Sequence, residues 1–251
     1  MTGAIGQVSN QPLTTGVDNP LSTQAQAPLS IVEQGMLLRA QDGKTSSGEV
    51  NGPQIITRPD GIKTDAFGVK MTGNEPVYDP ERWNWGWREP IQKYNNCYAY
   101  AVDDLKGDRT SMPQPGERGG NSYDFDAGDL INTARLKLAI EADGRDGKIT
   151  FLGTTPESTL AAAKGTYVVA LVVDTQDATQ DYHWYRHDAD GSWSGKSGRQ
   201  AVTNLDASGN RVLDPRTANR NFGSDRFGTL HYTEFVGYYA VKVGTEVGKR
   251  Q

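Results

Sequence analysis

Residues 166–174, TYVVALVVD, form a run of β-branched and other apolar side chains that predicts a buried β-strand. Two pairs of alternating segments follow between residues 181 and 214, and each pair is joined by a turn dipeptide, Asp-Gly in DADG and Ser-Gly in DASG. Such dipeptides between alternating segments are typical of β-hairpins. Residues 233–243, TEFVGYYAVKV, predict a last strand. The second half of the chain therefore predicts an antiparallel sheet of about four to six strands.

Three segments upstream of this sheet predict helices: residues 95–107, 127–144 and 154–165. An asparagine precedes Cys97 in the first segment, and a Thr-Pro pair opens the third; both are typical of helix starts. Apolar residues recur at helical spacing in the second segment, and a glycine ends each of the three. Helices followed by an antiparallel sheet predict an α+β fold with the helices packed on the sheet.

The N-terminal part of the chain has a different composition. The first thirty residues carry one charged side chain, Asp18, and are rich in Ser, Thr, Gln, Asn, Gly and Pro. A segment of this kind buries too little apolar area to offset the entropy of ordering it. We therefore predict a flexible or extended, largely irregular arm over residues 1–75, a folded domain over 76–243 and a polar tail over 244–251.

The arm also bears on localisation. It lacks the basic and apolar regions of a Sec signal peptide, which predicts a soluble protein that is cytoplasmic or exported without such a signal. Its polar composition resembles the start of bacterial type III effectors. That resemblance implies delivery into another cell and a protein partner that contacts the arm.

Charge and hydropathy exclude several classes of protein. The chain has 26 Lys and Arg against 31 Asp and Glu, a formal net charge of −5, and it contains no Lys/Arg run. This argues against a nucleic-acid partner, because such binding depends on neutralising phosphates. No run of about 18 apolar residues is present, which argues against a membrane span. The single cysteine, Cys97, excludes an intramolecular disulfide and a multi-cysteine zinc site, and we predict no metal.

Cys97 is a candidate nucleophile. It takes the first position of its predicted helix, where unpaired N–H groups and the helix dipole lower the pKa of a thiol. His183 lies on a predicted strand, shares one face with Tyr185 and His187, and is the candidate base and acid. The candidate oxyanion donors are Asn96 and Gln92, and the candidates to orient the imidazole are Asn204 and Asp206. The alternative is that Cys97 is a small core residue on an apolar helix stripe.

The segment NCYAYA at residues 96–101, followed by a strand-borne histidine, resembles the papain-like cysteine amidase and peptidase superfamily, especially CHAP-type and NlpC-type hydrolases. Its members place a polar residue before a cysteine that opens a helix, and a histidine on the sheet that follows. The resemblance implies cleavage of amide bonds, commonly in peptidoglycan, without a metal or organic cofactor. The NCYxYA segment, with PQPG and DYHWYR, is also similar to uncharacterised bacterial and phage proteins.

The segment RWNWGWREP supplies a candidate binding surface. In an extended conformation Trp83, Trp85 and Trp87 lie on one face and form a platform for sugar rings or a peptide side chain, which Trp184 can extend. The alternative is a strand whose aromatic face covers the edge of the core.

Together these features predict a cysteine-dependent hydrolase of amide or isopeptide bonds, acting on peptidoglycan or protein in a bacterial or phage setting. The alternative is a non-enzymatic protein that binds glycan or protein, or a structural component of a phage or secretion assembly. A reactive Cys97 favours the first hypothesis. A buried, unreactive Cys97 favours the second.

Overall fold

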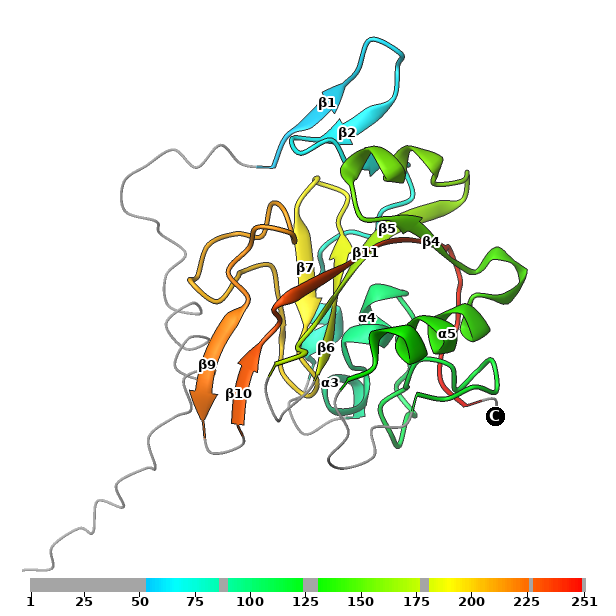
Figure 1. Cartoon of the computed structure of the whole chain (residues 1–251), viewed down its shortest axis with the longest axis vertical. Coiled ribbons are helices and arrows are strands. Elements are labelled where there is room, and N and C mark those ends of the chain that lie inside the picture. Colours follow the sequence, from blue (N-terminus) through cyan, green and yellow to red (C-terminus); the bar gives the residue numbers. More distant parts are fainter. Residues whose placement is uncertain (1–52, 86–89, 124–130, 177–180, 226–227, 250–251) are drawn as a thin grey trace, which may run out of the picture.

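A six-stranded antiparallel sheet forms the centre of the protein in its computed structural model (Figure 1). The structure describes residues 53–85, 90–123, 131–176, 181–225 and 228–249. The strand order is β4-β11-β5-β6-β7-β8. The bounds are β4 Ile149–Gly153, β5 Thr166–Val173, β6 Tyr182–His187, β7 Trp193–Lys196, β8 Val202–Thr203 and β11 Glu234–Lys242. With the helices described below, this sheet confirms the predicted α+β class.

The interior strand β5 lies between β11 and β6, and every one of its residues is buried. Apolar layers cover both faces of the sheet, which explains why this strand is a continuous apolar run rather than an alternating one. The first predicted hairpin is confirmed, since β6 and β7 pair around the DADG turn with Tyr185 opposite Gly195. The second is reduced to the short β8 and a bridge between Leu205 and Arg211.

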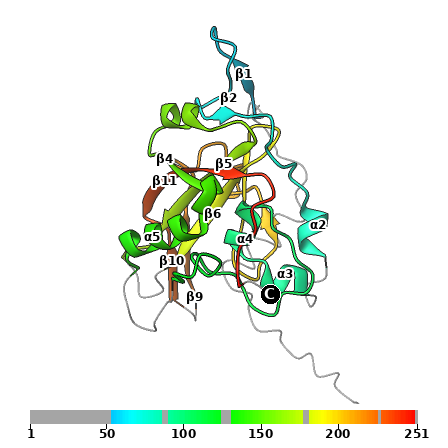
Figure 2. The same ribbon diagram turned by 90° about the vertical axis from the view of Figure 1, so that its right-hand side faces the viewer.

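Two helices cover one face of the sheet, α4 (Cys97–Ala101) and α5 (Thr133–Asp143) (Figure 2). Asn96 and Asn132 cap them by accepting hydrogen bonds from backbone amides in the first turn, as helix-start residues do. The helix predicted over residues 95–107 is shorter than expected. The chain turns out of it after Ala101, and Asp103 adopts a positive φ of 54°.

Other elements cover the opposite face. They are the 3₁₀ helix η2 (Pro156–Ala161), where a longer helix was predicted, and the loops around Val212 and Tyr232. A two-stranded sheet of β9 (Asn221–Asp225) and β10 (Gly228–His231) extends this layer. The remaining helical turns are α2 (Pro80–Asn84), α3 (Pro90–Tyr94) and η1 (Arg145–Gly147).

Residues 53–75 were expected to belong to the arm, yet they form a three-stranded sheet of β1 (Ile55–Thr57), β2 (Lys63–Asp65) and β3 (Lys70–Met71). Val69 is buried in the core layer, and the Lys70 amide donates a 2.9 Å hydrogen bond to Thr159 Oγ1. The turn before Val69 is held by Asp65, whose carboxylate accepts hydrogen bonds from the amides of Phe67 and Val69. Folded chain therefore begins well before residue 76, and residues 1–52 lie outside the described ranges.

The chain after residue 243 also packs against the core. Val247 is buried, and its amide donates a 2.8 Å hydrogen bond to Asp104 Oδ2. The described part of the expected tail, residues 244–249, is thus tied to the loop that follows α4.

The tryptophan segment is helical at its start, where an extended strand was predicted. Asp79 caps α2 by accepting a 3.0 Å hydrogen bond from the Arg82 amide, and Pro80 takes the first helical position. An Asp-Pro pair is a helix-start signal, and here it overrides the aromatic alternation that follows.

Candidate functional site

Cys97 begins α4 as predicted, but its thiol is enclosed. The residue is 6% exposed and packs among the apolar side chains between α4 and the sheet. Its Sγ lies 3.8 Å from the carbonyl oxygen of Tyr182 on β6. Burial, and then the nearby Asp181 carboxylate, raise the pKa of the thiol to about 12. The thiol is therefore protonated at neutral pH, because the cost of burying a thiolate exceeds the effect of the helix start.

His183 lies on the other face of the sheet. Tyr182 and Trp184 share the α4 face with Cys97, so alternation along β6 directs His183 and Tyr185 into the opposite layer. The imidazole stacks on Tyr232 at 5.4 Å between ring centroids and meets Tyr185 edge-on at 4.8 Å. Burial lowers its pKa to about 3. The prediction that His183 and Tyr185 share a face agrees with these contacts, but the structure does not bring that face to Cys97.

The predicted amide donors make structural hydrogen bonds. Asn96 caps α4 with its carbonyl oxygen and donates from Nδ2 to the Pro113 carbonyl at 2.9 Å. Gln92 donates from Nε2 to the Arg199 carbonyl at 3.3 Å. Both side-chain amides therefore already donate to backbone carbonyls, and neither is free to act as an oxyanion donor beside Cys97.

The predicted imidazole partners serve their own loop. The Asp206 carboxylate accepts hydrogen bonds from the amides of Ser208, Asn210 and Asn219. The Asn204 carbonyl accepts from the Val212 amide at 2.8 Å. These bonds close the DASG turn and join it to residue 219. Among the described residues, neither Asn204 nor Asp206 forms a hydrogen bond or ion pair with His183.

The four candidate tryptophans do not form a platform. Trp83 and Trp184 are buried in separate clusters, on either side of α4, and Trp87 lies outside the described residues. Trp85 is 75% exposed where α2 ends. It borders a shallow, open pocket of about 600 Å³ whose lining residues are Asp79, Glu81, Arg82, Asn84 and Trp85.

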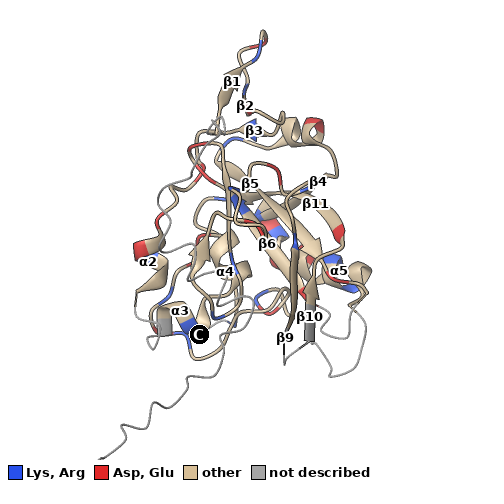
Figure 3. Ribbon diagram, turned by 90° about the vertical axis from the view of Figure 1, so that its left-hand side faces the viewer, with Lys and Arg blue, Asp and Glu red and all other residues tan. Residues whose placement is uncertain are grey.

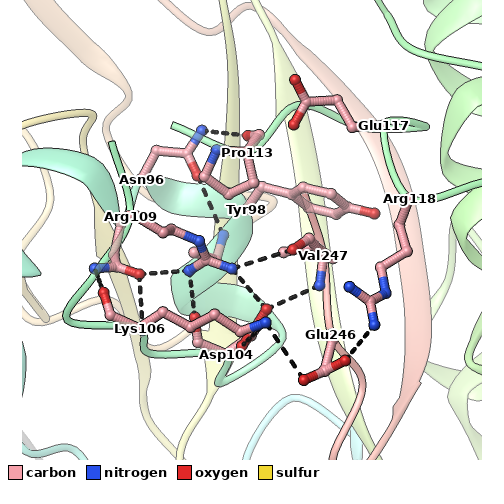
Figure 4. A network of polar contacts seen from close by, with 12 residues as sticks. Asn96, Tyr98, Asp104, Lys106, Arg109, Pro113, Glu117, Arg118, Glu246 and Val247 are labelled. Atoms are coloured by element: carbon pink, nitrogen blue, oxygen red, sulfur yellow. Dashed lines mark hydrogen bonds and ion pairs between the residues drawn. The ribbon is translucent and has the colours of Figure 1, made fainter. Parts of the chain in front are cut away.

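Sequence reasoning missed a polar network with a buried ion pair at its centre (Figure 4). Arg109 and Asp104 form an ion pair of 2.6 Å between side chains that are each 7% exposed. Arg109 also donates to Asn95 Oδ1 and to the carbonyl of Val247. The network joins α4 to the C-terminal segment, and its role is structural. Nothing in the local sequence marks Arg109, because its partners come from three different segments.

A second buried pair lies at the end of β6. Arg186 is fully buried, forms a 3.0 Å ion pair with Asp188 and lies 4.1 Å above the ring of Tyr100. In the ranges that the structure describes, no group of three or more His, Cys, Asp or Glu residues could hold a metal ion. Among the same residues, no helix is long and apolar enough to cross a membrane.

No family model matches the sequence, and no solved structure matches it. Insoluble matrix shell protein 1 from Ruditapes philippinarum is 36% identical to the chain over 164 residues, a match that covers 65% of this chain and 88% of that protein. The chain belongs to the insoluble matrix shell protein 1 family. This family membership covers far more of the chain than the segments around Cys97 and His183 on which the earlier resemblance was based.

The match corrects the hypothesis of a papain-like cysteine hydrolase from a bacterial or phage source. The resemblance to CHAP-type and NlpC-type enzymes depended on a cysteine at a helix start and a histidine on a strand. A buried core cysteine produces the same short pattern, because small apolar residues and asparagine caps are common at helix starts. The predicted function as a hydrolase, protease or amidase is therefore wrong, and peptidoglycan loses its support as a substrate.

The state of Cys97 gives a direct test. We expect iodoacetamide at about pH 8.5, the ordinary pKa of a free thiol, to leave the native thiol unmodified and to modify it fully in concentrated guanidinium chloride. The folded-state pKa is raised, so the stability that this group contributes is present below about pH 8.5 and is lost as the pH rises toward about 12. Mass spectrometry of native and denatured samples measures the modification. Rapid alkylation of the native protein would contradict the enclosed thiol.

Proposed function

We propose that this protein is a non-enzymatic structural component of an insoluble extracellular matrix. The observation that carries the proposal is the similarity to insoluble matrix shell protein 1, which extends over 88% of that protein. It supports other proteins or matrix components as partners. It favours an exported protein and gives the cytoplasmic alternative no support. A structural component of a phage or secretion assembly was the alternative expected from the sequence. We retain the structural role and drop the phage setting.

The placement of the ionisable groups supports a structural role. Cys97 and His183 are buried in different layers, and their pKa values are shifted toward the neutral forms of both side chains. Each buried arginine pairs with a nearby aspartate and also donates to a distant carbonyl, Arg109 to that of Val247 and Arg186 to that of Val77. Buried neutral groups and paired buried charges of this kind are compatible with a role in maintaining the fold.

The exposed strand β1 supplies a surface for assembly. It is the edge strand of the N-terminal sheet, which projects from the body of the protein (Figure 1). Ile55 and Ile56 are 46% and 45% exposed. An edge strand with exposed apolar side chains is a template for pairing with another chain. Two copies of β1 can pair antiparallel about a two-fold axis, because that arrangement presents the same surface from both partners.

The test measures self-assembly of the full chain. We expect the purified protein to form sedimentable material as its concentration rises, and Ile56→Lys to raise the required concentration by about tenfold, because a charge at an edge strand opposes pairing. Ultracentrifugation and light scattering report the assembly. Cys97→Ala should assemble like the wild type. In a second arm, fractionation of producing cells should recover the chain in the extracellular insoluble fraction.

The matched control is Val243→Lys, which adds the same charge at a position that is 56% exposed and outside β1. We expect it to assemble like the wild type. A chain that stays monomeric at all concentrations and is recovered from the cytosol would contradict the matrix role. Equal effects of the two lysine substitutions would contradict pairing through β1.

A further inference from the structure

Trp85 is a large apolar side chain that the fold holds in solvent. It follows directly on α2, whose other tryptophan, Trp83, is buried and meets the Tyr100 ring edge-on at 4.9 Å between centroids. Trp83 therefore anchors the helix while Trp85 stays 75% exposed beside the shallow pocket described above. An exposed indole at this position offers its ring as a contact surface for a ligand.

The pocket that Trp85 borders is also lined by polar groups. Asn84 Oδ1 accepts a 2.7 Å hydrogen bond from the Val202 amide on β8, which fixes the side chain. No described residue accepts a hydrogen bond from its Nδ2, so this group is available to donate. Glu81 is the acidic residue of α2, a helix that carries red colour in Figure 3, and it forms no hydrogen bond or ion pair with a described residue. The pocket thus combines a donor and an acceptor beside one aromatic ring.

The charge of the pocket selects among ligands. The Arg82 guanidinium lies 3.2 Å from Asp103 Oδ1, so its charge is partly neutralised by a residue that does not line the pocket. Asp79 and Glu81 add two carboxylates. An anionic ligand such as a sulfated or uronic-acid polymer would meet repulsion here, whereas a neutral ligand would not.

We propose that Trp85 and its pocket bind a pyranose ring of a neutral polysaccharide. The ring stacks its C–H face on the indole, Glu81 accepts from a hydroxyl and Asn84 donates to one. An apolar peptide side chain fits less well, because four of the five lining residues are polar or charged and a hydrocarbon side chain cannot form hydrogen bonds with them. This proposal rests on the proposed matrix role, for which a polysaccharide would be a binding partner. The experiment therefore measures polysaccharide binding and self-assembly separately.

The full chain is incubated with microcrystalline cellulose or with chitin particles, at concentrations below those that cause self-assembly, and centrifuged. We expect the wild type to pellet with at least one of these neutral β-linked polymers. We expect Trp85→Ala to bind it about tenfold or more weakly, as truncation of an aromatic anchor does. The matched control is Leu138→Ala, which removes another exposed apolar side chain, on α5, and should bind like the wild type.

Three results would overturn the assignment: no pelleting with either polymer, equal pelleting by wild type and Trp85→Ala, or Trp85-dependent binding to gelatin beads and to neither polymer. Self-assembly without particles is measured on the same samples. A Trp85→Ala chain that assembles and does not bind supports both proposals. A wild type that binds through Trp85 and never assembles retains the polysaccharide site and overturns the assembly proposal.

Discussion

Arg109→Met is expected to lower the free energy of unfolding by about 3–5 kcal/mol, because it leaves the Asp104 carboxylate buried without its ion-pair partner. The variant also leaves the Asn95 side-chain oxygen and the Val247 carbonyl without the guanidinium that donates to them (Figure 4). Denaturant unfolding followed by circular dichroism measures the change as a shift of the midpoint at constant slope.

Two controls separate the buried pair from charge in general. Glu246 forms exposed ion pairs with Lys106 and Arg118, so Glu246→Gln should change stability by less than about 1 kcal/mol. The double variant Asp104→Leu/Arg109→Met should recover part of the loss, because it removes the unpaired buried carboxylate but leaves the Val247 amide without its acceptor. A loss in Glu246→Gln as large as that in Arg109→Met would contradict a special role for the buried pair.

Trp184→Ala is expected to cost about 3–5 kcal/mol of stability, because it empties the centre of the α4 layer. The Trp184 ring lies 5.7 Å from the Tyr98 ring and 5.2 Å from the Tyr239 ring, measured between centroids, and the residue is 1% exposed. Thermal and denaturant unfolding measure the loss, and the near-ultraviolet circular dichroism of the folded variant reports the loosened aromatic packing.

Trp85→Ala is the matched comparison, because it removes the same side chain from the surface. We expect it to change stability by no more than about 0.5 kcal/mol. The two variants therefore distinguish a core tryptophan from one available for binding. Similar stability losses in both would contradict the different positions that the structure assigns to them.

The strands were predictable where the local pattern and the tertiary environment agree. β5 is apolar from Tyr167 to Val173 because both faces of the sheet are covered, and the DADG turn specifies the β6–β7 hairpin. The start of α4 was also predictable, because Asn96 supplies its cap within the same segment. The α2 helix was not predicted. The alternating tryptophans predict a strand, whereas the Asp79-Pro80 pair before them starts a helix.

The candidate site was less predictable. Alternation placed His183 and Tyr185 together correctly, but the face that α4 covers depends on packing between residues 97 and 182, which no local pattern contains. The same limit applies to β1–β3. Residues 53–75 are polar in composition, yet Val69 and Lys70 attach to the core through contacts with η2, more than eighty positions along the chain.

Local sequence alone was sufficient to assign the α+β class, the central strand and the capped start of α4, because hydrogen bonds and apolar periodicity within a segment specify these features. Tertiary structure decided that Cys97 is enclosed, that His183 lies in the opposite layer and that Trp85 alone among the described tryptophans is exposed. Burial and pairing across the sheet determine these properties, since the pKa of a side chain and its access to a ligand depend on neighbours from distant segments.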